Sequence, residues 1–214
     1  MDNYENSKQT SMRNKLVTLV SGGLDSLLMS ILAVEQDFDV FPLFIDYGQL
    51  AGPIEWVACR RNHTKHNLPT PKKMSLKGFG KVIHSGLTDP KMRIKEDAFL
   101  PGRNSLFLIA AGSFAYQVKS QNIAIGLLSE EFALFPDQTK KFASTAERFI
   151  SAEMGYKVKV LTPLIEFNKA EVLKLAKSRK ISGTYSCHTG KIKPCGKCVS
   201  CIEMNRAMSA IGGK

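Results

Sequence analysis

One glycine-containing turn decides the fold of this chain, and it reads Ser21-Gly22-Gly23-Leu24-Asp25-Ser26. An apolar run at 16–20 precedes the turn, and a helix-like run at 27–34 follows it. We therefore expect a strand, a tight turn and the N-terminus of a helix. Two glycines permit a sharp turn with bare N–H groups, and the free N–H groups and dipole of the helix add to them. The stretch predicts a cradle for a phosphate or a pyrophosphate.

The side chains of this turn narrow the prediction. The hydroxyls of Ser21 and Ser26 are further donors, and Asp25 fits an anion site if Mg²⁺ lies between it and the phosphates. A lone Gly-Gly pair is more often a plain strand–helix turn without a ligand. The full string is neither a Walker A loop nor a dinucleotide-binding glycine turn. It resembles the pyrophosphatase loop of enzymes that split ATP into AMP and pyrophosphate.

Composition limits the class of protein. The 214 residues suit one domain, or one domain with an appendage, and 43% hydrophobic residues are ordinary for a globular chain. No apolar run has the length of a membrane span, and the polar start lacks a signal-peptide core, so we expect a cytoplasmic protein with no membrane partner. The formal charge of +11 has two explanations: it indicates an anionic partner, or it only keeps the protein in solution. Because no long Lys/Arg run occurs, direct nucleic-acid binding is not expected.

Hydrophobic runs and turn signals alternate along the chain. We expect strands at 15–20, 39–47, 72–76, 122–127 and 158–161, and helices at 27–37, 54–65, 105–118, 142–154 and 169–179. This alternation predicts an α/β fold with a doubly wound parallel sheet, similar to a Rossmann fold. Residues 1–14 are expected to be a flexible N-terminus, 15–180 the α/β domain, and 181–214 a C-terminal appendage packed on it. Residues 78–97 stay unassigned, as a lid or a partner surface.

Two further stretches are expected at the same cleft as the turn. Asp46-Tyr47-Gly48-Gln49 follows the second strand, and ligands of open α/β sheets lie beyond the carboxyl ends of the strands. Arg103 comes directly before a helix that Asn104 or Ser105 is expected to cap, where a guanidinium suits a phosphate. The loop at 129–141, which holds Phe135 and Asp137, is expected to reach over the cleft. The last helix of the domain, at 169–179, is expected to be capped by Asn168.

Four of the five cysteines gather near the C-terminus, at Cys187, Cys195, Cys198 and Cys201. Four thiolates close a tetrahedral Zn²⁺ site with no open position, which is a structural site. Disulfides are rare in the cytoplasm, whereas an iron–sulfur cluster remains an alternative. His188 could replace a cysteine, although four thiols complete the set. The remaining cysteine, Cys59, is expected to pack in the core.

Taken together, these motifs resemble the 7-cyano-7-deazaguanine synthase family, over about residues 15–207. The motifs are Ser-Gly-Gly-Leu-Asp-Ser at 21–26, Asp-Tyr-Gly-Gln at 46–49, Pro-Gly-Arg-Asn at 101–104, Thr-Pro-Leu-Ile at 162–165, Lys-Ala-Glu at 169–171 and the cysteine tail. The resemblance implies a fold like that of the adenine nucleotide alpha hydrolases, and ATP, Mg²⁺ and Zn²⁺ as cofactors. It also implies a reaction, in which ATP adenylates a deazaguanine carboxylate, ammonia displaces AMP to give an amide, and a second ATP leads to a nitrile. A homodimer is expected from the family alone.

The resemblance also suggests roles for individual residues. The loop at 21–26 would hold pyrophosphate and Mg²⁺, while Arg103 and Lys169 would offset charge on the phosphates. The second stretch, 46–49, and Asn104 would complete the ATP site. Gln49, Phe135 and Asp137 would contact the deazaguanine.

Two segments depart from the family pattern. After Gln49, the stretch Leu-Ala-Gly-Pro at 50–53 lacks the basic and His residues that are usual there. After Asp137, family members usually have Cys-Arg, whereas this chain continues Gln138-Thr139. Three alternatives therefore stay open: an enzyme that stops at the amide or joins the acid to another amine, such as one on a protein; a tRNA-modifying pyrophosphatase; and a zinc-bound adaptor whose loop is a relic.

Overall fold

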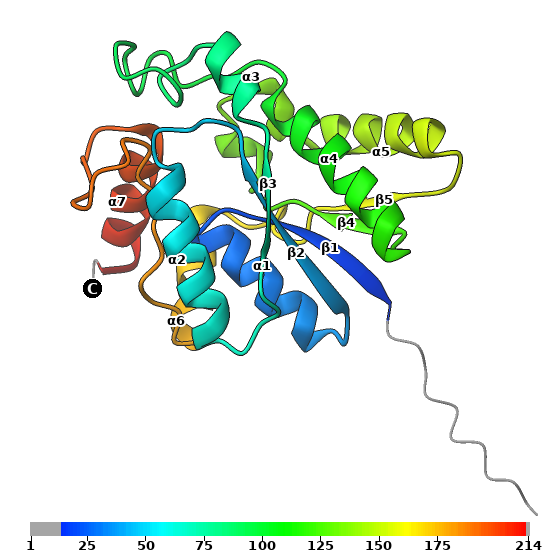
Figure 1. Cartoon of the computed structure of the whole chain (residues 1–214). Helices are drawn as coiled ribbons and strands as arrows, with labels where there is room; N and C mark the ends of the chain where they lie inside the picture. Colours follow the sequence, from blue (N-terminus) through cyan, green and yellow to red (C-terminus); the bar gives the residue numbers. More distant parts are fainter. Residues whose placement is uncertain (1–13, 213–214) are drawn as a thin grey trace, which may run out of the picture.

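A computed structural model describes residues 14–212 (Figure 1). The expected flexible N-terminus, apart from Asn14, lies outside the described residues. Among the residues that are described, no helix has both the length and the apolar character needed to cross a bilayer.

Five parallel strands form a single sheet in the order β3-β2-β1-β4-β5. Their bounds are β1 Lys15–Val20, β2 Asp39–Asp46, β3 Lys72–Ser75, β4 Asn122–Ala124 and β5 Lys159–Leu161. The chain moves outward from β1 in one direction through β2 and β3, and in the other through β4 and β5. Ligands of such sheets bind beyond the strand ends where this direction reverses. That point is the carboxyl end of β1, where the glycine turn begins.

Helices cover both faces of the sheet, which confirms the doubly wound α/β prediction (Figure 1). The helices are α1 Leu24–Glu35, α2 Gly52–Lys65, α3 Lys77–Val82, α4 Arg103–Val118, α5 Lys140–Met154, α6 Lys169–Ser178 and α7 Val199–Gly212. On one face α4 and α5 bury Leu108 and Ile150. On the other, α1, α6 and α7 bury Leu28, Val172 and Ala207. The sheet is therefore shielded on both sides, and only its strand ends are open to a ligand.

The second helix, α2, packs on β1 and β2 through a small apolar cluster of its own. Cys59 of α2 is buried there with Val20 and Phe44, and the ring of Trp56 lies 5.2 Å from that of Phe44. The packing role expected for Cys59 is confirmed.

The helix α6 begins where the sequence predicted. The Asn168 side chain accepts a hydrogen bond from the Glu171 N–H (3.0 Å), and the Glu171 carboxylate accepts one from the Asn168 N–H (2.8 Å). This reciprocal capping box fixes the first turn of α6, and with it the position of Lys169.

Several expected boundaries were wrong. The helix α4 begins at Arg103, and its N-cap is Gly102 (φ 77°) with no side-chain cap, so the expected cap by Asn104 or Ser105 is absent. The side chain of Asn104 instead donates to the backbone of Asp137. Strand β4 ends at Ala124, opposite the last residue of β5, although the Ile125 N–H still donates to the Leu161 carbonyl (3.1 Å). The expected loop after β3 contains α3, and the tail contains α7, which was not predicted.

Candidate active site

The turn between β1 and α1 is shaped by glycine and by its own hydroxyls. Gly22 has φ +115°, and a Cβ on it would lie 2.4 Å from the backbone oxygen of Glu55. The Ser21 N–H donates to Oγ of Ser26 (3.1 Å), and the Gly23 N–H donates to Oγ of Ser21 (3.2 Å). Gly23 is the N-cap of α1 and offers no side-chain cap, so the first-turn N–H groups have no side-chain acceptor there. The local geometry suits an anion.

An ion pair crosses the site from α1 to α6. Lys169 Nζ lies 2.7 Å from both carboxylate oxygens of Asp25, and the lysine is 7% exposed. Glu203 of α7 lies close to this pair, and burial raises the pKa of its carboxyl group. The Asp25 carboxylate is thus paired with an ammonium group. The sequence analysis expected a cation, Mg²⁺, next to the same carboxylate.

The stretch after β2 divides between two environments. Asp46 turns to the edge strand, where its carboxylate pairs with Lys73 (2.8 Å) and Lys77 (3.6 Å). Tyr47 is buried against Phe107, with ring centroids 5.3 Å apart, and burial raises the pKa of its phenol to about 12. The Gln49 amide accepts from the Tyr47 N–H (3.0 Å). Its Nε2 donates to the Glu55 carboxylate (3.0 Å), so Glu55 of α2 joins the site.

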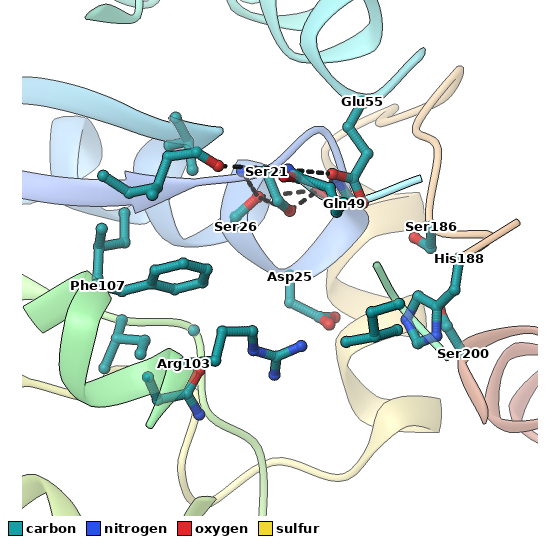
Figure 2. Close-up of a pocket in the computed structure, with 18 of the residues that line it drawn as sticks. Ser21, Asp25, Ser26, Gln49, Glu55, Arg103, Phe107, Ser186, His188 and Ser200 are labelled. Atoms are coloured by element: carbon teal, nitrogen blue, oxygen red, sulfur yellow. Dashed lines mark hydrogen bonds between the residues drawn. The ribbon is translucent and has the colours of Figure 1, made fainter. Parts of the chain in front are cut away.

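The start of α4 brings Arg103 to the side of the cavity that lies opposite Gln49 and Glu55 (Figure 2). The Arg103 guanidinium lies 5.9 Å from the centre of the Phe107 ring, and its buried Nε has no hydrogen-bond partner among the described residues. Asn104 donates to the carbonyl of Asp137 (3.0 Å) and so ties the loop at 129–141 to α4. An unpaired guanidinium nitrogen of this kind is suited to a phosphate or carboxylate ligand.

The C-terminal tail forms a further wall of the same cavity (Figure 2). Its side chains come from Ser186, His188, Ser200 and Glu203. The tail is tied to the glycine turn by a hydrogen bond from the Tyr185 N–H to the Gly22 carbonyl (2.9 Å). Burial lowers the pKa of His188 to about 4, and the Arg103 charge adds to this effect, so the imidazole is neutral at pH 7.

Behind this wall, the four cysteines predicted as metal ligands lie together. The Sγ atoms of Cys187, Cys195, Cys198 and Cys201 all lie within 4.8 Å of one another. A tetrahedral ion with Zn–S bonds of about 2.3 Å separates its thiolates by about 3.8 Å, and the Cys195 and Cys201 sulfurs are 4.0 Å apart. The cluster therefore fits one tetrahedral metal ion. His188 faces the cavity instead.

These parts enclose one cavity of about 300 Å³ at the carboxyl ends of the strands. The sequence-predicted residues that line it are Ser21, Gly23, Asp25, Ser26, Tyr47, Gln49, Arg103, Asn104, Phe135 and Lys169. Those that do not line it are Gly22, Leu24, Asp46, Gly48 and Asp137. The sequence analysis missed Glu55, Phe107, Ser186, Ser200 and Glu203, which also line it. Glu55 lies in the first turn of α2, and no sequence signal marked it, because a glutamate at a helix start is ordinary.

Comparison with known proteins identifies the family. The family model described as "Queuosine biosynthesis protein QueC" matches residues 15–212. The chain belongs to this family. The resemblance expected from the motifs is confirmed, and so is the class of enzyme, an ATP-dependent ligase of the synthase type. A zinc-bound adaptor with a relic loop is thereby set aside.

Two curated relatives are called 7-cyano-7-deazaguanine synthase. The protein from Methanobrevibacter smithii is 31% identical, with 92% of this chain and 93% of the relative covered. That from Campylobacter jejuni is 28% identical, with 95% and 97% covered. A solved structure from Methanocaldococcus jannaschii, described as a predicted subunit of tRNA methyltransferase, has a TM-score of 0.54 at 14% identity, covering 77% of this chain and 76% of that one. Because the sequence identity to this solved structure is low, the similarity shows only that the two folds are alike.

Proposed function

We propose that this chain converts 7-carboxy-7-deazaguanine into 7-cyano-7-deazaguanine with ATP and ammonia, through an acyl-adenylate and an amide. The supporting observation is that one cavity gathers the 21–26 loop, Arg103 of α4 and Lys169 of α6. Family membership supports the same reaction, because the curated relatives are named for this product.

The first step is an adenylation. A carboxylate oxygen of the substrate attacks the α-phosphorus of ATP, and the bond to the bridging oxygen of pyrophosphate breaks. In the proposed site the N–H groups and hydroxyls of 21–26 hold the departing pyrophosphate, while Arg103 and Lys169 offset its charge. No nucleophilic side chain is required, so positioning and electrostatics supply the catalysis.

Asp25 is the residue proposed to hold Mg²⁺. Its carboxylate faces the cavity and already binds a cation, the Lys169 ammonium, and carboxylate oxygen is the ligand type that Mg²⁺ takes. When bound, the ion would neutralise phosphate charge. Lys169 is then available to contact the phosphates directly. Because the two roles are coupled, substitution of either Asp25 or Lys169 should affect the function of the other.

The four cysteines are proposed to hold a structural Zn²⁺. Burial raises the pKa of Cys198 and Cys201. At Cys187, by contrast, the hydrogen bonds from Thr189 and from the Cys195 N–H outweigh burial and lower the pKa, so Cys187 most readily forms the thiolate that zinc needs. Residues 15–180 would then form the ATP-binding unit and 181–214 a metal-binding segment packed on it. The ion would fix the tail wall of the cavity.

The deazaguanine is proposed to lie between Gln49 and the loop at 129–141. Phe135 lines the cavity, and its ring lies 5.1 Å from that of Phe99, so a flat heterocycle would find aromatic surface there. The Asp137 carboxylate has one buried oxygen without a partner among the described residues. Because Gln138-Thr139 replaces the usual Cys-Arg, a second candidate function is an enzyme that stops at the amide or joins the acid to another amine.

The remaining partners follow from the family. The proposed enzyme works in the cytoplasm on small molecules, as a homodimer, and without nucleic acid. Salt-sensitive binding of tRNA would favour the tRNA-modifying alternative instead.

The direct test is mass spectrometry of a reaction that contains the protein, ATP, Mg²⁺, 7-carboxy-7-deazaguanine and ammonium. We expect AMP, pyrophosphate and the nitrile, and their loss in Asp25→Ala. AMP with an amide as the final product would select the second candidate. No AMP from the wild-type protein would contradict the substrate assignment.

A further inference from the structure

Two carboxylates of the cavity, Glu55 and Glu203, form no ion pair within residues 14–212; Glu203 lies close to the Lys169 charge, whereas Glu55 lies on the far side of the glycine turn, on α2. Glu55 lines the cavity, and one of its oxygens accepts a hydrogen bond from Gln49 Nε2 (3.0 Å) (Figure 2). Within residues 14–212, the other oxygen has no hydrogen bond, and no Lys, Arg or His forms an ion pair with Glu55. Asp25, by contrast, is fully engaged by Lys169. Glu55 is thus an anionic group left open toward a cavity that is proposed to bind phosphates.

The position of Glu55 is fixed from two sides. Its backbone oxygen packs so closely against Gly22 that a Cβ there would lie 2.4 Å away. Its carboxylate is held by Gln49, whose amide is itself held by the Ile45 carbonyl (3.3 Å) and the Tyr47 N–H (3.0 Å). A carboxylate held rigidly beside an anion-binding loop repels phosphate. It is complementary to a small cation or to a donor that carries positive charge.

We propose that Glu55 binds the ammonium ion that supplies the nitrogen and accepts its proton before the C–N bond forms. This inference rests on the proposed function. The Glu55 carboxylate takes one proton from ammonium, and the lone pair released on ammonia attacks the acyl carbon of the acyl-adenylate. The bond from that carbon to the phosphate oxygen breaks, and its electron pair leaves with AMP. A second proton passes from the nitrogen to solvent.

The charges around Glu55 agree with this role. Burial raises the pKa of its carboxyl group to about 7, with the Asp46 charge acting in the same direction, while the Gln49 hydrogen bond and the Arg103 charge oppose it. Tyr47, after β2, and Tyr185, on the tail, also face it, and both phenols have raised pKa values and are neutral near pH 7. A group that gains and loses a proton near neutral pH is suited to general base catalysis.

The test separates adenylation from amide formation in Glu55→Gln. The glutamine keeps the size of the side chain and an acceptor for Gln49. We expect the ATP–pyrophosphate exchange rate, and the KM for 7-carboxy-7-deazaguanine in that exchange, to stay within about twofold of wild type. Amide formation from ammonium should fall by about a hundred- to ten-thousand-fold. Hydroxylamine is unprotonated at neutral pH and needs no base, so hydroxamate formation should be the same in both proteins.

The pH profile adds a second readout. At fixed total ammonium, the wild-type rate of amide formation should rise up to about pH 7 and then level, whereas the Glu55→Gln rate should keep rising with the concentration of free ammonia. Glu55→Asp should recover part of the rate. Glu153→Gln, an exposed change on α5, is the matched control and should alter nothing.

Three outcomes would overturn the inference. Equal ammonium-dependent rates in the wild type and Glu55→Gln would show that no base is needed at this position. A raised KM for the acid in the exchange reaction would assign Glu55 to substrate binding. Absence of exchange in the wild-type protein would overturn the proposed function and, with it, the role of Glu55, which distinguishes that failure from the other two.

Discussion

Two walls of the active-site cavity are built in different ways. The sheet wall consists of the 21–26 loop together with Gln49 and Glu55. The tail wall includes the polar residues Ser186, His188, Ser200 and Glu203, with Tyr185 and Val199 beside them. Both face the same cavity, but the first follows from strands and helices packed in the domain core, whereas the second combines Ser186 and His188, from a segment with little regular structure, with Ser200 and Glu203 at the start of α7.

The support behind each wall explains the difference. Behind the sheet wall, Val17 and Leu28 are fully buried, and burying each such side chain stabilises the fold by about 1.5–3 kcal/mol. Behind the tail wall, the buried residues are mainly the cysteines themselves, with Ile94 and Tyr185 against them. Four thiols without a bound ion contribute little to the stability of the folded tail. The sheet wall is therefore held by packing, whereas we expect the segment before α7, which carries Ser186 and His188, to depend on the proposed metal ion.

The largest expected effect comes from a change in the sheet wall. Gly22→Ala places a Cβ on a backbone with φ +115° and 2.4 Å from the Glu55 oxygen. The conformation alone costs about 1–3 kcal/mol, and the contact forces the loop and α2 apart. We expect loss of ATP–pyrophosphate exchange by at least about a hundredfold, together with lower stability in urea.

Gly155→Ala is the matched control for this change. Gly155 also has a positive φ, +69°, but no atom lies within 4 Å of a Cβ built on it. It should lose about 1–2 kcal/mol of stability and keep its exchange activity. Equal loss of activity in both variants would mean that instability, rather than the shape of the loop, decides the result.

Metal removal is the corresponding test of the tail wall. Chelation, or Cys198→Ser, should release one zinc per chain and lower the unfolding temperature. A loss of about 3 kcal/mol corresponds to a fall of roughly 6–12 °C in a domain of this size. Hydrogen exchange should show opening confined to about 182–201. Meanwhile the fluorescence of Trp56, the single tryptophan, which packs on Phe44 of the sheet, should stay native. Loss of the native Trp56 signal at the same chelator concentration would show that the two walls unfold together.

A smaller effect on stability and on ATP binding is expected from the hydrogen bonds that join α2 to the tail. The Arg61 guanidinium donates to the Gly183 carbonyl, and Asn62 donates to the same oxygen (3.2 Å). Arg61→Ala removes one of these bonds and should cost about 1 kcal/mol. We expect the KM for ATP to rise a few fold while the zinc content stays the same, because the tail moves relative to the loop. Arg60→Ala is the control, since Arg60 lies over Trp56 and makes no bond to the tail. A similar KM in both variants would contradict the link.

Much of the sheet wall was predictable from local sequence. The 21–26 loop, β1 and the capped start of α6 depend on neighbours within a few residues, where hydrophobic period and cap chemistry are informative. The ion pair of Asp25 with Lys169 spans 144 positions in the sequence. That pairing depends on how α6 packs beside α1, and periodicity does not encode it. Both residues were singled out, but not as partners.

The tail wall was predictable only in part. Cysteine spacing identified the four metal ligands, yet α7 was missed, because its first turn lies within the cysteine array and hides the helical period. Ser186 and Ser200 reach the cavity because they lie beside the cysteines in a tail that folds against the loop, and the sequence alone does not show that folding. Glu55 was missed for a different reason: a helix-start glutamate is ordinary, and only the Gln49 contact and the cavity distinguish it.

The smallest expected effect compares how the sheet and the cysteine tail respond to acid. Burial disfavours the charge of Asp46, but the hydrogen bond and charge of Lys73 outweigh it, so the pKa of Asp46 is lowered on folding. A lowered pKa contributes stability above the unfolded value of about 3.9, and that contribution is lost as the pH falls through the folded value. Asp46→Asn should therefore cost about 1 kcal/mol at pH 7 and nothing in strong acid.

The cysteine thiolates behind the tail wall should respond to milder acid, since protons compete with the proposed metal ion for them. Zinc release on lowering the pH should thus precede the loss of the Asp46 contribution, measured as the difference in urea midpoint between the wild type and Asp46→Asn at each pH. If zinc stays bound until that difference in urea midpoint has vanished, the tail resists acid better than the Asp46 ion pair does. That result would contradict the proposed contrast between a wall held by packing and a wall held by a metal ion.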